Sequence, residues 1–387
     1  MSRLHTAIFA ASLALAFSAQ GVANDKPRPA KGTAELQYRL VEIPYVSPDG
    51  REGETRAVSI NDRGDVLAVG TDRTQTTPTG IPLENYFIWR RGRVVAELNT
   101  PDPAYPYLTA LGINNRSEVV GAIATTDPGS AFGGFRGFVW RRGHFTVLGP
   151  LPSTGGNTVG VAMNDWGEVA GYSQDSDVDI FLTAFRWYRG RFVELPNPAA
   201  NSAGAVDINN RGQVVGTISR DGLGLLFDGY VWSRKGSVHF LDSLSGVRGM
   251  APRAINDRGQ IVGTAVYPDS SLNRAFLWED GTVLDLGTLP GAIDSNAQAI
   301  NVFGTVVGYV TPASGGIVAM VWRDGQMHDL NEMIADDDPL RSRVHLSYAS
   351  DINNFGWIAA NGIDPNSTSV PKQAHGYLLI PIWKHRR

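Results

Sequence analysis

One short sequence motif, called a phrase below, occurs seven times, and this repetition limits the folds that the chain can adopt. At residues 205–216 the phrase reads AVDINNRGQVVG, and every copy has a central asparagine, a turn and a short apolar run. A recurring unit of about 45–50 residues is typical of repeat architectures, in which each unit packs against its neighbours. The asparagines at the centres of the copies are Asn61, Asn114, Asn164, Asn209, Asn256, Asn301 and Asn353.

A second, aromatic phrase follows most copies of the first, as in TAFRWYRGRFVEL at 183–195. Both phrases consist of short β-branched or aromatic runs bounded by turn residues, which favours strands over helices. Four strands in each unit is the pattern of a propeller blade. We therefore predict an all-β, seven-bladed β-propeller of four-stranded antiparallel blades, with the asparagine strand innermost. Six tryptophans recur in register: Trp89, Trp140, Trp187, Trp232, Trp278 and Trp322.

The two ends of the chain complement each other. The last unit has a third strand, AHGYLLIPI at 374–382, but no fourth, and LQYRLVEI at 36–43 resembles the missing one. We predict that this N-terminal strand completes the last blade and leaves no open sheet edge. The expected organisation is a signal peptide (1–23), a short polar linker (24–35), the propeller (36–383) and a basic tail (384–387).

The N-terminus predicts export. Arg3 precedes an apolar run at about 7–19, and Gly21-Val22-Ala23 suits signal cleavage. A membrane anchor is the alternative, but a spanning helix needs about 20 apolar residues. The chain has no cysteine, which excludes disulfides and thiolate catalysis. We expect a periplasmic or extracellular protein, monomeric and not inserted in the membrane after cleavage.

The charge of the chain argues against nucleic acid as a partner. Its formal net charge is −4 and both signs are interspersed along the sequence. A nucleic-acid or anionic-lipid partner usually requires a basic stripe. None is evident in the linear sequence.

The stretches 137–171 and 275–308 resemble the HAF repeat, an extracellular repeat family named for a His-Ala-Phe strand start. The second stretch reads AFLWEDGTVLDLGTLPGAIDSNAQAINVFGTVVG. The resemblance covers nearly the whole chain after residue 23, although Arg274 and Thr183 stand where the family has histidine. It implies secretion and a propeller-like fold, and it implies no particular activity.

The loop lengths distinguish the two faces of the predicted ring. The tight NDRG and RRG turns share one face, and the long connections 71–85, 122–136, 173–183 and 331–348 share the other. Variable loops on a rigid scaffold usually carry recognition. We therefore expect an unknown protein or glycan to bind the long-loop face.

Candidate metal motifs in the sequence are weak. Asp175, Asp177 and Asp179 resemble the start of a calcium loop, but Ile180 and Arg186 stand where glycine and glutamate are needed. We predict no cofactor and no metal site, with calcium at this loop as the alternative. The acidic cluster at 335–339 reads as a solvated loop, and Arg63-Gly64-Asp65 as a chance RGD within a repeated turn.

No catalytic residue and no ligand-binding residue is identified. The histidines (His144, His239, His328, His345 and His375) do not cluster, and nothing selects a pair among the loop acids Asp72, Glu84, Asp102, Asp127, Asp221, Asp269 and Asp294. The repeated asparagines and tryptophans are interpreted as turn caps and packing residues.

We predict a non-catalytic binding or scaffolding module. The alternatives are a propeller lyase or hydrolase acting on an envelope polymer, and a structural surface protein. Loop carboxylates that converge at the central channel with shifted pKa values would favour the enzyme.

Overall fold

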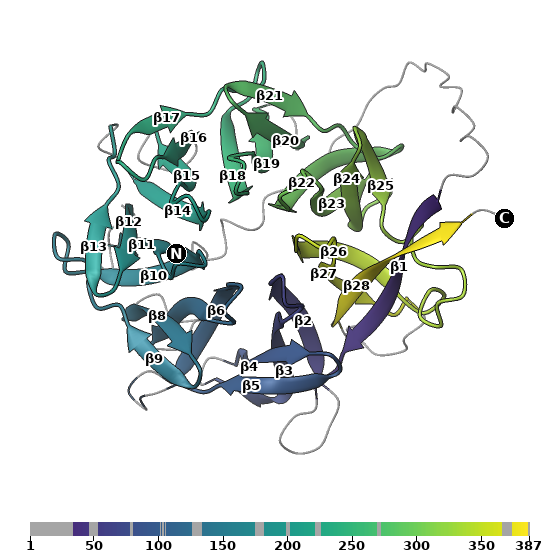
Figure 1. Cartoon of the computed structure of the whole chain (residues 1–387), viewed down its shortest axis with the longest axis horizontal. Helices are drawn as coiled ribbons and strands as arrows, with labels where there is room; N and C mark the ends of the chain where they lie inside the picture. Colours follow the sequence, from purple (N-terminus) through teal and green to yellow (C-terminus); the bar gives the residue numbers. More distant parts are fainter. Residues whose placement is uncertain are drawn as a thin grey trace.

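The protein is all-β, with its strands arranged in sheets around a central opening (Figure 1). The computed structural model describes residues 34–45, 53–77, 80–100, 102, 104, 106–125, 134–174, 182–198, 202–220, 226–268, 272–365 and 374–385. These residues form 28 strands. They contain no helix that is long and apolar enough to cross a membrane.

The first three sheets follow the chain in simple order, and each is a four-stranded antiparallel meander. One contains β2 (Glu54–Ile60), β3 (Val66–Thr76), β4 (Pro82–Arg90) and β5 (Arg93–Leu98). The next contains β6 (Tyr107–Ile113), β7 (Val119–Ala124), β8 (Phe135–Arg141) and β9 (His144–Val147). The third contains β10 (Asn157–Met163), β11 (Val169–Gln174), β12 (Leu182–Tyr188) and β13 (Arg191–Glu194).

Eight further strands are joined in one sheet by a single parallel pairing between Phe227 and Gly249. Its first half is β14 (Ala203–Ile208), β15 (Val214–Ser219), β16 (Phe227–Trp232) and β17 (Val238–Phe240). Its second half is β18 (Gly249–Ile255), β19 (Ile261–Val266), β20 (Arg274–Glu279) and β21 (Thr282–Asp285). Each half repeats the four-stranded meander of the other sheets.

The remaining strands form two four-stranded sheets. One contains β22 (Ala292–Ile300), β23 (Val306–Pro312), β24 (Val318–Arg323) and β25 (Gln326–Asp329). The other has the order β1 (Ala34–Ile43), β28 (Ala374–His385), β27 (Ile358–Ile363) and β26 (His345–Ile352). Strand β1 pairs antiparallel with β28 from Ala34↔His385 to Ile43↔Gly376.

The repeated phrases specify both the strands and the packing between sheets. The valine-rich second strands are buried on both faces, as in β7. The glycine that ends each VVG run lies under the neighbouring strand; a Cβ on Gly216 would stand 2.1 Å from the carbonyl oxygen of Gly204. Four of the six repeated tryptophans are buried, which confirms their interpretation as packing residues: Trp89, Trp140, Trp187 and Trp232.

The segment between β25 and β26 is a clamp on β1 rather than a free loop. The amide of Tyr38 donates to the carbonyl of Met333 at 2.8 Å, and the amide of Ala335 donates back to the Tyr38 carbonyl at 2.9 Å. The carboxylate of Asp338 accepts the amide of Leu40 at 2.9 Å. Asp338 is only 6% exposed, so the expectation of a solvated acidic cluster at 335–339 is wrong for this residue.

Candidate functional site

The seven asparagines form a continuous circuit of hydrogen bonds. Within its own turn, Asn209 accepts the amides of Arg211 and Gln213 on its side-chain oxygen. Its side-chain nitrogen donates to the carbonyl of Asn256 in the next unit at 3.0 Å. All seven repeat this last bond at 2.9–3.2 Å, and that of Asn353 returns to Asn61. The asparagines are therefore turn caps, as predicted, and they also link neighbouring units.

A second polar ring lies at the mouth of the channel on the tight-turn side. Its members directly follow the asparagines: Asp62, Asn115, Asp165, Asn210, Asp257, Val302 and Asn354. Amides and carboxylates alternate, so that the Asn115 side chain donates to both Asp62 and Asp165, at 3.0 and 3.1 Å. Only Val302 interrupts the alternation. The carboxylates are held by neighbouring amides, which makes this ring a structural element.

Farther along the channel wall, the last three units carry polar residues at a position where the first four carry apolar ones. The residue three positions before the asparagine is apolar in the first four units: Val58, Leu111, Val161 and Val206. In the last three units it is Arg253, Gln298 and Ser350. These three lie on innermost strands that border the central opening (Figure 1). Each sits at a β-bulge outside the register of its ladder, a feature that re-aims side chains.

Two tyrosines extend this polar surface. The hydroxyl of Tyr348 donates to the side-chain oxygen of Gln298 at 3.0 Å. The rings of Tyr309 and Tyr348 lie 5.4 Å apart at 35°, and both side chains are partly exposed. We call Arg253, Gln298, Tyr309, Tyr348 and Ser350 the polar arc.

Burial and a nearby cation set the protonation state of the arc. Burial raises the pKa of Tyr348 to about 12, and the positive charge of Arg253 acts in the opposite direction. Arg253 acts on Tyr309 in the same way. Both phenols therefore stay protonated at neutral pH and can donate hydrogen bonds.

One predicted loop acid lies beside the arc. Asp294 is buried, and the side-chain amides of Asn273 and Asn296 donate to its carboxylate. Burial raises its pKa to about 6. Burial also raises the pKa of Tyr309, and the charge of Asp294 adds to that increase. Asp294 lies in β22 rather than in a loop. Among the described acids singled out from the sequence, it is the one whose pKa is raised, which makes it a candidate for a functional role.

Two further channel acids have structural partners. The carboxylate of Asp207 accepts the amides of Ile208 and Ile255, both at 2.8 Å, and so bridges two innermost strands. Burial raises its pKa to about 7. Asp351 occupies the matching position in the last unit and bonds to Ile60 in the first. Burial raises its pKa as well.

The other sequence candidates do not converge where the structure describes them. Asp65 of the RGD is fully buried and bonded to Arg90, which agrees with a chance match. His144, His239 and His328 lie on three different outer strands, and no group of three metal-binding side chains occurs in the described ranges. Asp72 is buried, and Glu84 pairs with Arg56. The calcium-like residues Asp175, Asp177 and Asp179, and the loop acids Asp127, Asp221 and Asp269, lie outside the described residues.

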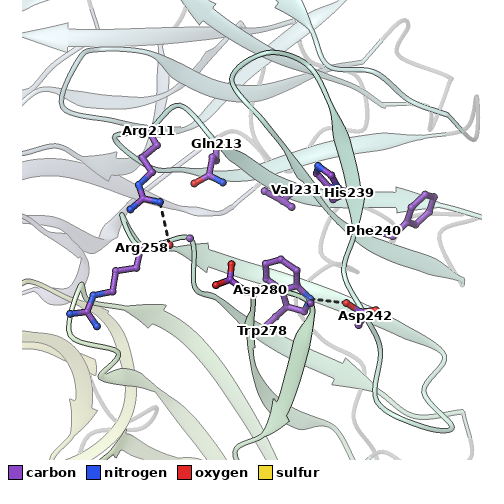
Figure 2. Close-up of a pocket in the computed structure, with 11 residues that line it drawn as sticks. Arg211, Gln213, Val231, His239, Phe240, Asp242, Arg258, Trp278 and Asp280 are labelled. Carbon is purple, nitrogen blue, oxygen red and sulfur yellow. Dashed lines mark hydrogen bonds between the residues drawn. The ribbon is translucent and has the colours of Figure 1, made fainter.

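A cavity of about 410 Å³ opens on the tight-turn side between the two halves of the eight-stranded sheet (Figure 2). The indole nitrogen of Trp278 donates to Asp242 at 3.3 Å, and Arg211 donates to the backbone carbonyl of Arg258 at 3.5 Å. The side chains of His239, Arg258 and Asp280 also line this cavity.

A column-by-column reading of the repeats would have indicated the polar arc. The change from valine or leucine to Arg253, Gln298 and Ser350 is visible in the sequence. Tyr348 has no such signal, because its contact with Gln298 depends on how neighbouring sheets pack.

Comparisons with known proteins support the fold alone. No protein-family model matches the chain, and no curated protein matches it. Among solved structures, it is similar to virginiamycin B lyase from Staphylococcus aureus, with 11% identity, a TM-score of 0.50, and coverage of 89% of this chain and 100% of that one.

Two peptidases are also similar. An acylaminoacyl peptidase shows 12% identity and a TM-score of 0.51, over 85% of this chain and 52% of that one. A prolyl endopeptidase shows 10% identity and a TM-score of 0.52, over 91% and 50%. This chain spans about half the length of these peptidases. The similar structures and the four-stranded antiparallel sheets together indicate a β-propeller.

Proposed function

We propose that this protein is an exported, closed, seven-bladed propeller that binds an envelope protein or glycan without catalysis. Counting the eight-stranded sheet as two blades is supported by its single joining residue pair. Closure is supported by the pairing of β1 with β28 and by the asparagine circuit that returns to Asn61. The proposed binding site is the polar arc on the channel wall, in which Tyr348 lies nearest to the long loops.

The observation that carries this proposal is the one-sidedness of the channel wall. Three consecutive units replace an apolar residue by Arg253, Gln298 and Ser350. The Ser350 hydroxyl bonds to the backbone carbonyls of Ala57 and Ala359, so the proposal rests chiefly on the other two. Tyr348 lies three residues after the start of β26 and five before Asn353, which places it toward the long loops. Tyrosine faces with amide and guanidinium donors suit a sugar ring or a peptide.

A photo-reactive amino acid at Gln298 tests the proposal in living cells. We expect covalent capture of one envelope component, and we expect Arg253→Ala to reduce that capture severalfold. The matched control carries the same probe at Leu111, the equivalent bulge position of the second unit. Equal capture from both positions, or none at Gln298, would contradict the proposal.

The second candidate is a lyase or hydrolase acting on an envelope polymer, and Asp294 is the residue that favours it. A carboxyl with a pKa of about 6 can act as a general acid or base near neutral pH. The assay follows the release of new chain ends from purified envelope polysaccharide. Product that depends on Asp294 and disappears in Asp294→Asn would establish the enzyme. If the polymer binds but no product forms between about pH 5 and 8, the result would contradict the enzyme and support the binding module.

A further inference from the structure

The tight-turn face carries a concentration of positive charge that the proposed site does not use. The third and fourth strands of several units are joined by two-residue turns whose second residue is glycine. The first residue is Arg91, Arg142 or Arg189 in the first three units, and Asp280 or Asp324 in two later ones.

The three arginines occupy an unfavourable backbone conformation. Their φ angles are 48°, 47° and 48°, in the left-handed region that favours glycine, asparagine and aspartate. Asp280 and Asp324, with φ of 47° and 51°, satisfy this preference. Arginine thus occurs three times at a turn position that asparagine would suit better, and such local strain often marks a functional surface.

The nearby carboxylates are already paired with other cations, and among the described residues Arg189 makes only a cation-π contact with the Tyr188 ring, at 5.1 Å. Three other cations form salt bridges with carboxylates that follow the turn between the first and second strands of a unit. They are Arg90, Arg141 and Arg234. Next to them, six exposed cations form no salt bridge with any residue in the described part of the chain: Arg91, Arg93, Arg142, Arg189, Arg191 and Lys235. We call these six the basic crescent; they follow four consecutive units (Figure 1).

We propose that the basic crescent binds a linear acidic polysaccharide. Guanidinium groups form paired hydrogen bonds with carboxylate and sulfate groups, and repeated charges along a polymer match repeated charges along an arc. A flat bilayer would also meet Glu279, Asp280 and Asp324 on the remaining part of this rim, whereas a flexible chain can follow the crescent alone.

The experiment measures binding of the full chain to polygalacturonate and dextran sulfate, with neutral dextran as the blank. We expect both acidic polymers to bind at low salt and to be released as salt rises, because binding displaces counterions. The double variant Arg142→Asn with Arg189→Asn should bind about tenfold more weakly. Its melting temperature should be equal or higher, because asparagine suits the left-handed turn position.

The matched control is Arg248→Asn with Arg343→Asn, which removes two exposed charges from the long-loop side. It should keep its affinity. Equal loss in both double variants would overturn the crescent as the site, and so would no binding of either polymer at low salt. Tighter binding of a single-stranded oligonucleotide than of either polysaccharide would overturn the assignment of the ligand.

Discussion

At the residue scale, each repeated asparagine caps its own turn and bonds to the next unit, and five of the seven also donate to the side chain four residues on. The oxygen of Asn209 caps two amides of its turn, and its nitrogen reaches the next unit and Gln213. The sequence predicts the cap, because asparagine before a glycine turn is a local pattern. It does not predict the bond to the next unit, which exists only once the sheets are packed around the opening.

Replacing Asn209 with alanine should therefore lower the free energy of unfolding by about 2–3 kcal/mol, since several buried groups lose their partners. Chemical denaturation measures this change. The control is Arg211→Ala, an exposed residue of the same turn, for which we expect at most about 0.5 kcal/mol. Similar costs for the two variants would contradict the circuit as a stabilising element.

Asp207 should make stability depend on pH. Its pKa is about 7 in the folded protein against 3.8 for an ordinary aspartate, so the folded state holds the proton more tightly. Its contribution to stability is complete below about pH 4 and is lost as the pH rises to about 7. The free energy of unfolding should therefore fall more steeply across this window in the natural protein than in Asp207→Asn. Parallel pH profiles for the two proteins would refute this assignment.

At the element scale, strand β1 is held from both sides. One edge pairs with β28 and the other contacts the segment 333–338. The N-terminal strand was predictable because the last unit lacks a fourth strand. The clamp was not, because its acidic sequence resembles a solvated loop and Asp338 becomes buried only against β1.

Asp338→Ala should loosen β1 specifically. Loss of a buried acceptor for the Leu40 amide should cost about 1–3 kcal/mol and speed hydrogen exchange across residues 34–43. Exchange in β6–β9 should stay unchanged. The matched control is Asp337→Ala, whose exposed ion pair with Arg39 is screened by water and should contribute little to stability. Equal effects of the two variants on β1 would show that the clamp has no role.

At the scale of the whole molecule, the repeated scaffold presents different chemistry on two surfaces. The polar arc lies on the channel wall of the last three units, and the basic crescent lies on the tight-turn face of the first four. The crescent is not apparent in the linear sequence, because the net charge of −4 sums the charges of both faces and the two signs are interspersed. Only the fold brings equivalent turn positions together.

Both proposed surfaces require the proposed closed ring, and an engineered disulfide tests its closure most directly. The chain has no cysteine, so Arg39→Cys with Ile380→Cys places one thiol on each of two residues that face each other in β1 and β28. Directly opposed residues in antiparallel strands are about 4.5–5.5 Å apart, within reach of a disulfide. We predict an intramolecular disulfide under mild oxidation and a higher melting temperature. Failure of this pair to form, or equal formation by the offset pair Arg39→Cys with Leu378→Cys, would contradict the closed ring.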